Sequence, residues 1–162
     1  MNLNIRIPQS HMVLARQDLP RPHAFAYERV GFFRCRPTSR PDLVVVTGYD
    51  PVPDEDYVRN SNAAACIGSM AIESAMQRIL THKTGQIHVH LHEHHGRPSP
   101  SPTDMENQPR LITSFRNLDP QVPHGFIILS ETHAWGLFAI PGQKRLIKLK
   151  SVSVVSGRVE FL

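Results

Sequence analysis

The chain has 162 residues, which suits one domain with a real hydrophobic core. Its 18 basic and 14 acidic residues leave a net charge of +4, which excludes the dense basic stripe of a dedicated nucleic-acid binder. Cys35 and Cys66 form no CxxC motif, and we find no signal peptide, no apolar run long enough to span a membrane and no lipidation motif. We therefore expect a reduced, cytoplasmic protein with no nucleic-acid or membrane partner.

The first third of the chain predicts mainly strands. Apolar, β-branched and aromatic residues bounded by proline and glycine are typical of strands. We expect strands at 3–7, 12–15, 24–36 and 42–49. The stretch 50–59 contains two prolines and four acidic residues, and we interpret it as a loop.

Two helices are expected in the middle of the chain. The first is capped by Ser61 or Asn62 and ends near Leu80. Its apolar residues recur at helical spacing: Ile67, Met70, Ala71, Ala75, Ile79 and Leu80. The second runs from about Thr103 to Arg116, and Ser101, Pro102 and Asp104 have the pattern of a capped helix start.

The remaining segments predict strands again. Residues 86–92 alternate strictly between apolar and polar side chains, and strands follow at 125–130 and 134–140. The last segment, 144–162, is interpreted as two short strands around Gly157. Strands mixed with two or three helices indicate the α+β class and a single domain over residues 1–162.

Histidine is the unusual feature of this sequence. Ten are present, and five of them lie between His88 and His95. Side chains two residues apart on a strand share one face and lie about 6.6 Å apart along it, so a pair of imidazoles can converge on one ion. Catalytic zinc sites use three protein ligands and a water, and Asp104 is the acidic residue expected to complete the set. A histidine tract that binds metal adventitiously is the alternative.

The combination of motifs resembles the JAMM (MPN+) zinc metalloproteases. His90-Leu-His92 is followed by Pro100-Ser101-Pro102-Thr103-Asp104, and Glu28-Arg-Val-Gly31 stands upstream. The resemblance covers roughly residues 10–142. It implies a JAMM/MPN, cytidine-deaminase-like fold, in which a curved mixed sheet is flanked by two or three helices.

The resemblance also implies roles for individual residues. His90, His92 and Asp104 would bind Zn²⁺, Glu28 would be the general base, and Ser101 would donate a hydrogen bond to the oxyanion. The spacing from His92 to Asp104 is one residue longer than the family pattern, and Glu93 replaces the usual proline. His92 with His94 is therefore an alternative ligand pair, while His88 would be structural or support the ligands and His95 would be a solvated loop residue.

The implied function is an isopeptidase or peptidase that cleaves after the C-terminus of a ubiquitin-like protein. The histidine strand most resembles bacterial members that accompany activating-like and conjugating-like enzymes, and this resemblance implies a role in antiphage defence. Alternatives are a peptidase that processes a sulfur-carrier protein, a non-catalytic MPN scaffold that binds proteins, and a metal-storage module.

Overall fold

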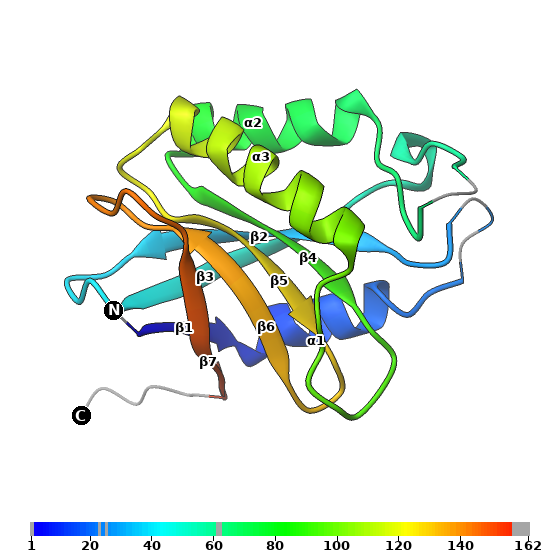
Figure 1. Cartoon of the computed structure of the whole chain (residues 1–162), viewed down its shortest axis with the longest axis horizontal. Helices are drawn as coiled ribbons and strands as arrows, with labels where there is room; N and C mark the ends of the chain where they lie inside the picture. Colours follow the sequence, from blue (N-terminus) through cyan, green and yellow to red (C-terminus); the bar gives the residue numbers. More distant parts are fainter. Residues whose placement is uncertain (1, 23, 25, 61–62, 157–162) are drawn as a thin grey trace.

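A computed structural model describes residues 2–22, 24, 26–60 and 63–156 (Figure 1). Within these residues seven strands, three α-helices and one 3-10 turn follow one another along the chain. In order they are β1 (Leu3–Pro8), α1 (Gln9–Asp18), β2 (Val30–Pro37), β3 (Leu43–Pro51), η1 (Asp54–Asp56), α2 (Ser69–His82), β4 (Gly85–Leu91), α3 (Pro102–Leu118), β5 (His124–Leu129), β6 (Ala134–Ala139) and β7 (Ile147–Val155).

The strands form one sheet that closes on itself. Their order is β1-β3-β2-β4-β5-β6-β7, and β7 pairs with β1 to complete a barrel. Ile5 lies opposite Val44 of β3 on one side and opposite Val152 of β7 on the other, and both pairings are parallel. The expected curved JAMM/MPN sheet flanked by two or three helices is therefore wrong, because the strands that would be its free edges pair with each other.

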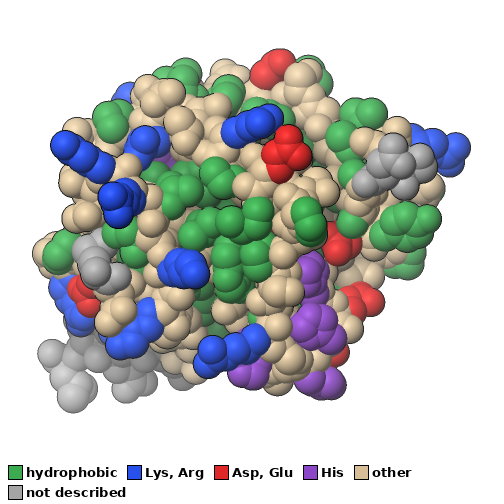
Figure 2. Space-filling model, viewed as in Figure 1, with side chains coloured by type: hydrophobic (Ala, Val, Ile, Leu, Met, Phe, Trp, Pro, Cys, Tyr) green, Lys and Arg blue, Asp and Glu red, His purple; other side chains and the backbone are tan. Residues whose placement is uncertain are grey.

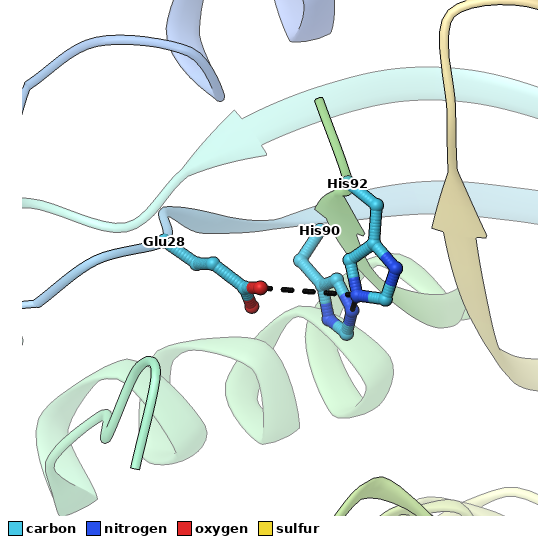
Figure 3. A group of neighbouring side chains, drawn as sticks. All are labelled: Glu28, His90 and His92. Carbon is cyan, nitrogen blue, oxygen red and sulfur yellow. Dashed lines mark hydrogen bonds and ion pairs between the residues drawn. The ribbon is translucent and has the colours of Figure 1, made fainter. Parts of the chain in front are cut away.

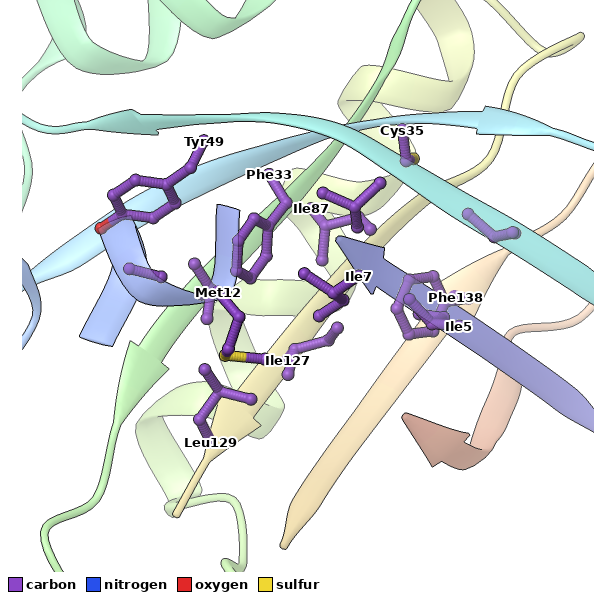
Figure 4. Close-up of a cluster of buried hydrophobic side chains, with 14 of the residues drawn as sticks. Ile5, Ile7, Met12, Phe33, Cys35, Tyr49, Ile87, Ile127, Leu129 and Phe138 are labelled. Carbon is purple, nitrogen blue, oxygen red and sulfur yellow. The ribbon is translucent and has the colours of Figure 1, made fainter. Parts of the chain in front are cut away.

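The main hydrophobic core fills the barrel. Alternate residues of the strands point inward, and Met12 of α1 packs against them (Figure 4). Ala15 of α1 and Leu19, which follows the helix, belong to the same core. A second cluster lies between the outer face of the sheet and the helices α2 and α3, where Phe32 packs with Phe115. Strand β4 is consequently covered on both faces, and all seven of its residues are buried.

The segment 12–15 forms part of a helix and not a strand. Met12, Ala15 and Leu19 are buried at intervals of three and four residues, which is helical periodicity. The prediction failed because four consecutive residues, Met12 to Ala15, also fit a short strand, and only the wider window contains the helical spacing.

Several element boundaries also differ from the predictions. Helix α2 begins after Gly68, while Ser61 and Asn62, the expected caps, lie outside the described residues. The last segment contains one strand up to Val155, and Gly157 also lies outside the described residues. The predicted cap of α3 is confirmed, since Ser101 and Asp104 form a capping box with Pro102 in the first turn.

Among the described residues, no helix combines the length and the apolar character needed to cross a lipid bilayer.

A disulfide can test the closure of the barrel. Asn4 is paired with Ser151, and the Ser151 hydroxyl donates to Asn4 Oδ1 at 2.7 Å. We expect the double variant Asn4→Cys/Ser151→Cys to form a disulfide on oxidation and to gain about 2–4 kcal/mol of unfolding free energy in denaturant titrations. The matched control is Asn4→Cys/Ser153→Cys, about 6.6 Å farther along β7, which should remain reduced. Failure of the first pair to cross-link would contradict the parallel β1–β7 pairing.

Candidate metal centre

The pairing of β2 with β4 brings two distant motifs together. These strands are antiparallel, with Val30 opposite His90 and Gly31 opposite Val89. The same register, continued two residues beyond Val30 and His90, places Glu28 opposite His92. Residues opposite each other in an antiparallel pair have neighbouring side chains, so this register explains the proximity of Glu28 and His92.

Two anchors fix the backbone on either side of the Glu28 side chain. The amides of Tyr27 and Glu28 both donate to the carbonyl of Ala64, at 2.8 and 3.1 Å. Arg29 is 3% exposed, and its guanidinium donates to the carbonyls of Arg21 and Pro22 and to Asp54 Oδ1. Sequence reasoning missed Arg29, although an arginine next to a candidate base, followed by the apolar start of β2, is a recognisable signal.

The side chains of β4 point alternately into the core of the barrel and toward the layer under helices α2 and α3. Ile87, Val89 and Leu91 join the core of the barrel, so Gln86, His88 and His90 face the side covered by the helices. His92 follows directly after the strand, and its amide still donates to the carbonyl of Leu129 at 2.8 Å.

Glu28, His90 and His92 bring their ligand atoms to one point (Figure 3). One nitrogen or oxygen atom from each residue lies within 4.8 Å of the others. The Nε2 atoms of His90 and His92 are 3.2 Å apart, and His92 Nε2 is 3.8 Å from Glu28 Oε1. Two nitrogens bound tetrahedrally to zinc at about 2.0–2.1 Å are separated by about 3.3 Å. The histidine pair therefore has the spacing that a shared zinc ion requires.

Ser101 and Asp104 lie next to each other at the start of α3. Asp104 Oδ2 accepts from the Ser101 amide at 2.8 Å and from the Ser101 hydroxyl at 2.7 Å, while the Asp104 amide donates to Ser101 Oγ at 3.1 Å. Asp104 does not belong to the group of three ligand atoms, although its charge acts on Glu28, His90 and His92. Its role as a ligand, and that of Ser101 as an oxyanion donor, stay predictions.

The alternative ligand His94 lies outside the group formed by the described residues. Its Nδ1 accepts from the Gly96 amide at 3.1 Å, and its side chain is exposed in the loop that follows β4. His95 is also exposed and pairs with Glu131 at 3.1 Å. In Figure 2, histidine side chains gather at the lower right of the viewed face, and hydrophobic side chains occupy a hollow in its centre.

Burial tunes the site in a direction that suits metal binding. It lowers the pKa of His90 and of His92, and the nearby Asp104 only partly offsets this effect. Both rings are therefore neutral at pH 7, which is the form that binds a metal ion. Burial, followed by the negative charge of Asp104, raises the pKa of Glu28 to about 7. A carboxylate with this pKa is suited to accept a proton near neutral pH.

The donor set fits zinc, which accepts imidazole nitrogen and carboxylate oxygen. Cys35 does not contribute, because it is buried, its thiol donates to the carbonyl of Pro123, and burial raises its pKa. The geometry thus brings together two imidazoles and the carboxylate of Glu28. Asp104 lies near enough for its charge to act on all three residues, but it is not part of this group.

In a comparison with known proteins, no model of a protein family matches the chain, and no curated protein has a matching sequence.

Zinc content tests the choice of histidines. We expect purified protein to bind about one zinc ion per chain, and His90→Ala and His92→Ala to lose it because each removes an imidazole ligand. His94→Ala is the matched control and should retain the ion. Atomic absorption after gel filtration measures the content. Loss of zinc in His94→Ala with retention in His90→Ala would assign the site to His92 and His94.

A pair of variants separates the two possible roles of Asp104. Asp104→Ala and Ser101→Ala both break the capping box, which costs about 0.5–2 kcal/mol of unfolding free energy. Only Asp104→Ala removes a carboxylate, so we expect it alone to lose zinc. Equal zinc content in the two variants would show that Asp104 only caps the helix.

Proposed function

We propose that this protein is a zinc-dependent hydrolase of amide bonds. The observation that carries the proposal is the convergence of Glu28, His90 and His92 within 4.8 Å, although Glu28 lies 62 residues before His90 in the sequence. Zinc held by His90, His92 and a carboxylate would supply a Lewis acid that activates water at neutral pH and polarises the scissile carbonyl.

The protein's own groups would carry the proton transfers. Glu28 would accept a proton from the attacking water and deliver it to the leaving amine as the carbon–nitrogen bond breaks. Ser101 would donate a hydrogen bond from its hydroxyl to the developing oxyanion and keep its proton, which requires the hydroxyl to turn away from Asp104 Oδ2. The products are a carboxylic acid and an amine.

The proposed substrate is a ubiquitin-like protein joined through its C-terminus to an amine, and the proposed location is the cytoplasm. This assignment rests on the likeness of His90-Leu-His92, Ser101-Pro-Thr-Asp104 and Glu28 to the JAMM motif. Partners of the same conjugation system, an activating-like and a conjugating-like enzyme, would supply the substrate.

Activity on a defined conjugate tests the proposal. A ubiquitin-like protein linked through its C-terminal glycine to a reporter amine should be cleaved at that bond. Dialysis against a chelator should abolish release of the reporter, and added zinc should restore it. Cleavage that survives complete removal of metal would contradict a zinc-dependent mechanism.

Glu28→Gln provides the sharpest test of the mechanism. Glutamine keeps the shape of the side chain but cannot accept the proton, and loss of a positioned general base costs about 10²–10⁴ in rate. Zinc content should stay near that of the wild type, and turnover should fall. Both are measured on one preparation, because loss of zinc would make Glu28 a ligand and unchanged turnover would exclude it as the base.

A further inference from the structure

His88 is a polar side chain in an apolar cage. It is 5% exposed, and its ring lies 5.5 Å from the ring of Phe32 and 5.7 Å from that of Phe126. Its Nδ1 atom is buried and has no hydrogen-bond partner among the described residues. An unpaired buried polar group destabilises a fold, whereas an apolar ring in the same cage does not. Packing alone therefore does not explain why a histidine occupies this position.

The neighbour of His88 on the same face of β4 is the candidate ligand His90. Their ring centroids are 6.2 Å apart, and the rings meet edge to face at 77°. His90 directs Nε2 toward His92, which leaves Nδ1 as its second nitrogen. In metal sites the second nitrogen of a ligating histidine donates to a polar partner, which fixes the tautomer and the orientation of the ring.

The ring centroids of His88 and His90 lie 6.2 Å apart, and a nitrogen on the near side of each ring is closer than that to the other ring. Two hydrogen bonds of about 2.8 Å that meet at a water span roughly 4.5 Å, and buried waters commonly join polar groups that otherwise lack a partner. A neutral imidazole offers one acceptor and one donor, so His88 can complete such a bridge and phenylalanine cannot.

We infer that His88 is a positioning residue that holds the imidazole of His90, through an ordered water, in the orientation that presents Nε2 to the metal ion. The inference deepens the proposed function and rests on it, because it requires His90 to be a ligand. His88 itself does not touch the ion or the substrate.

Gln86 supplies a matched control on the same strand. It is fully buried, and neither atom of its side-chain amide has a hydrogen-bond partner among the described residues. It lies on the same face as His88 but on the side away from His90, because side chains two residues apart point the same way. Replacing either residue by an apolar one removes a buried polar group that has no hydrogen-bond partner among the described residues. Only the change at His88 also removes the proposed partner of His90.

The experiment compares His88→Phe, His88→Asn and Gln86→Met as full-length proteins, with zinc titration and with cobalt(II) as a spectroscopic substitute. We expect His88→Phe to weaken zinc binding by roughly tenfold or more and to change the cobalt absorption spectrum. Its metal-free melting temperature should equal or exceed that of the wild type. His88→Asn keeps a polar atom near Nδ1 and should recover part of the affinity, while Gln86→Met should bind both metals as the wild type does.

The outcomes separate this inference from the proposed function. Wild-type affinity and an unchanged cobalt spectrum in His88→Phe would overturn the positioning role and leave the metal site intact. An equal loss of affinity in His88→Phe and Gln86→Met would also overturn it, because any change in β4 would then suffice. A wild type that binds no zinc would overturn the site itself. Should His88→Phe not fold, His88→Leu provides the second apolar variant.

Discussion

The candidate site depends on the register of one antiparallel strand pair. Val30 lies opposite His90, and this alignment carries the flanking residues of the two segments, Glu28 and His92, to the same place. A shift of the register by one residue would turn the histidines into the hydrophobic barrel and separate them from Glu28. The core on both sides of β4 opposes such a shift, because Ile87 and Val89 would then leave the apolar interior. The packing of the barrel therefore also fixes the strand register on which the geometry of the site depends.

Burial has two effects in this centre, and they are complementary. The same low-polarity surroundings disfavour the positive form of the imidazoles and the negative form of Glu28. The histidines are held in the neutral form that can bind a metal ion, and the pKa of the Glu28 carboxyl group rises to about 7. One cause explains all three pKa shifts, because desolvation is the largest contribution at Glu28, His90 and His92. Asp104, on a more open helix start, adds the negative charge that raises the pKa of Glu28 further.

Sequence patterns predicted local features better than long-range ones. The alternation in 86–92 predicted β4, and Ser101 with Asp104 predicted the cap of α3, because both depend on neighbouring residues. Closure of the barrel depends on the pairing of β1 with β7, which no local pattern encodes, and this is why the expected open sheet was wrong. The contact between Glu28 and His92 is also long-range, because the two residues are far apart in the sequence. It was anticipated only through a resemblance of motifs, while Arg29, which belongs to no motif, was missed.

The pairing of the first strand with the last has a consequence for the order of folding. Ile5 contacts Val152, so the barrel closes only after β7 has been synthesised, and contacts of such long sequence separation form slowly. Glu28, His90, His92 and Asp104 all precede that strand. A nascent chain therefore contains all of these candidate ligand residues before it has a closed fold. If the proposed site binds its metal ion at that stage, the ion would join β2 to β4 early and favour the native pairing of these strands.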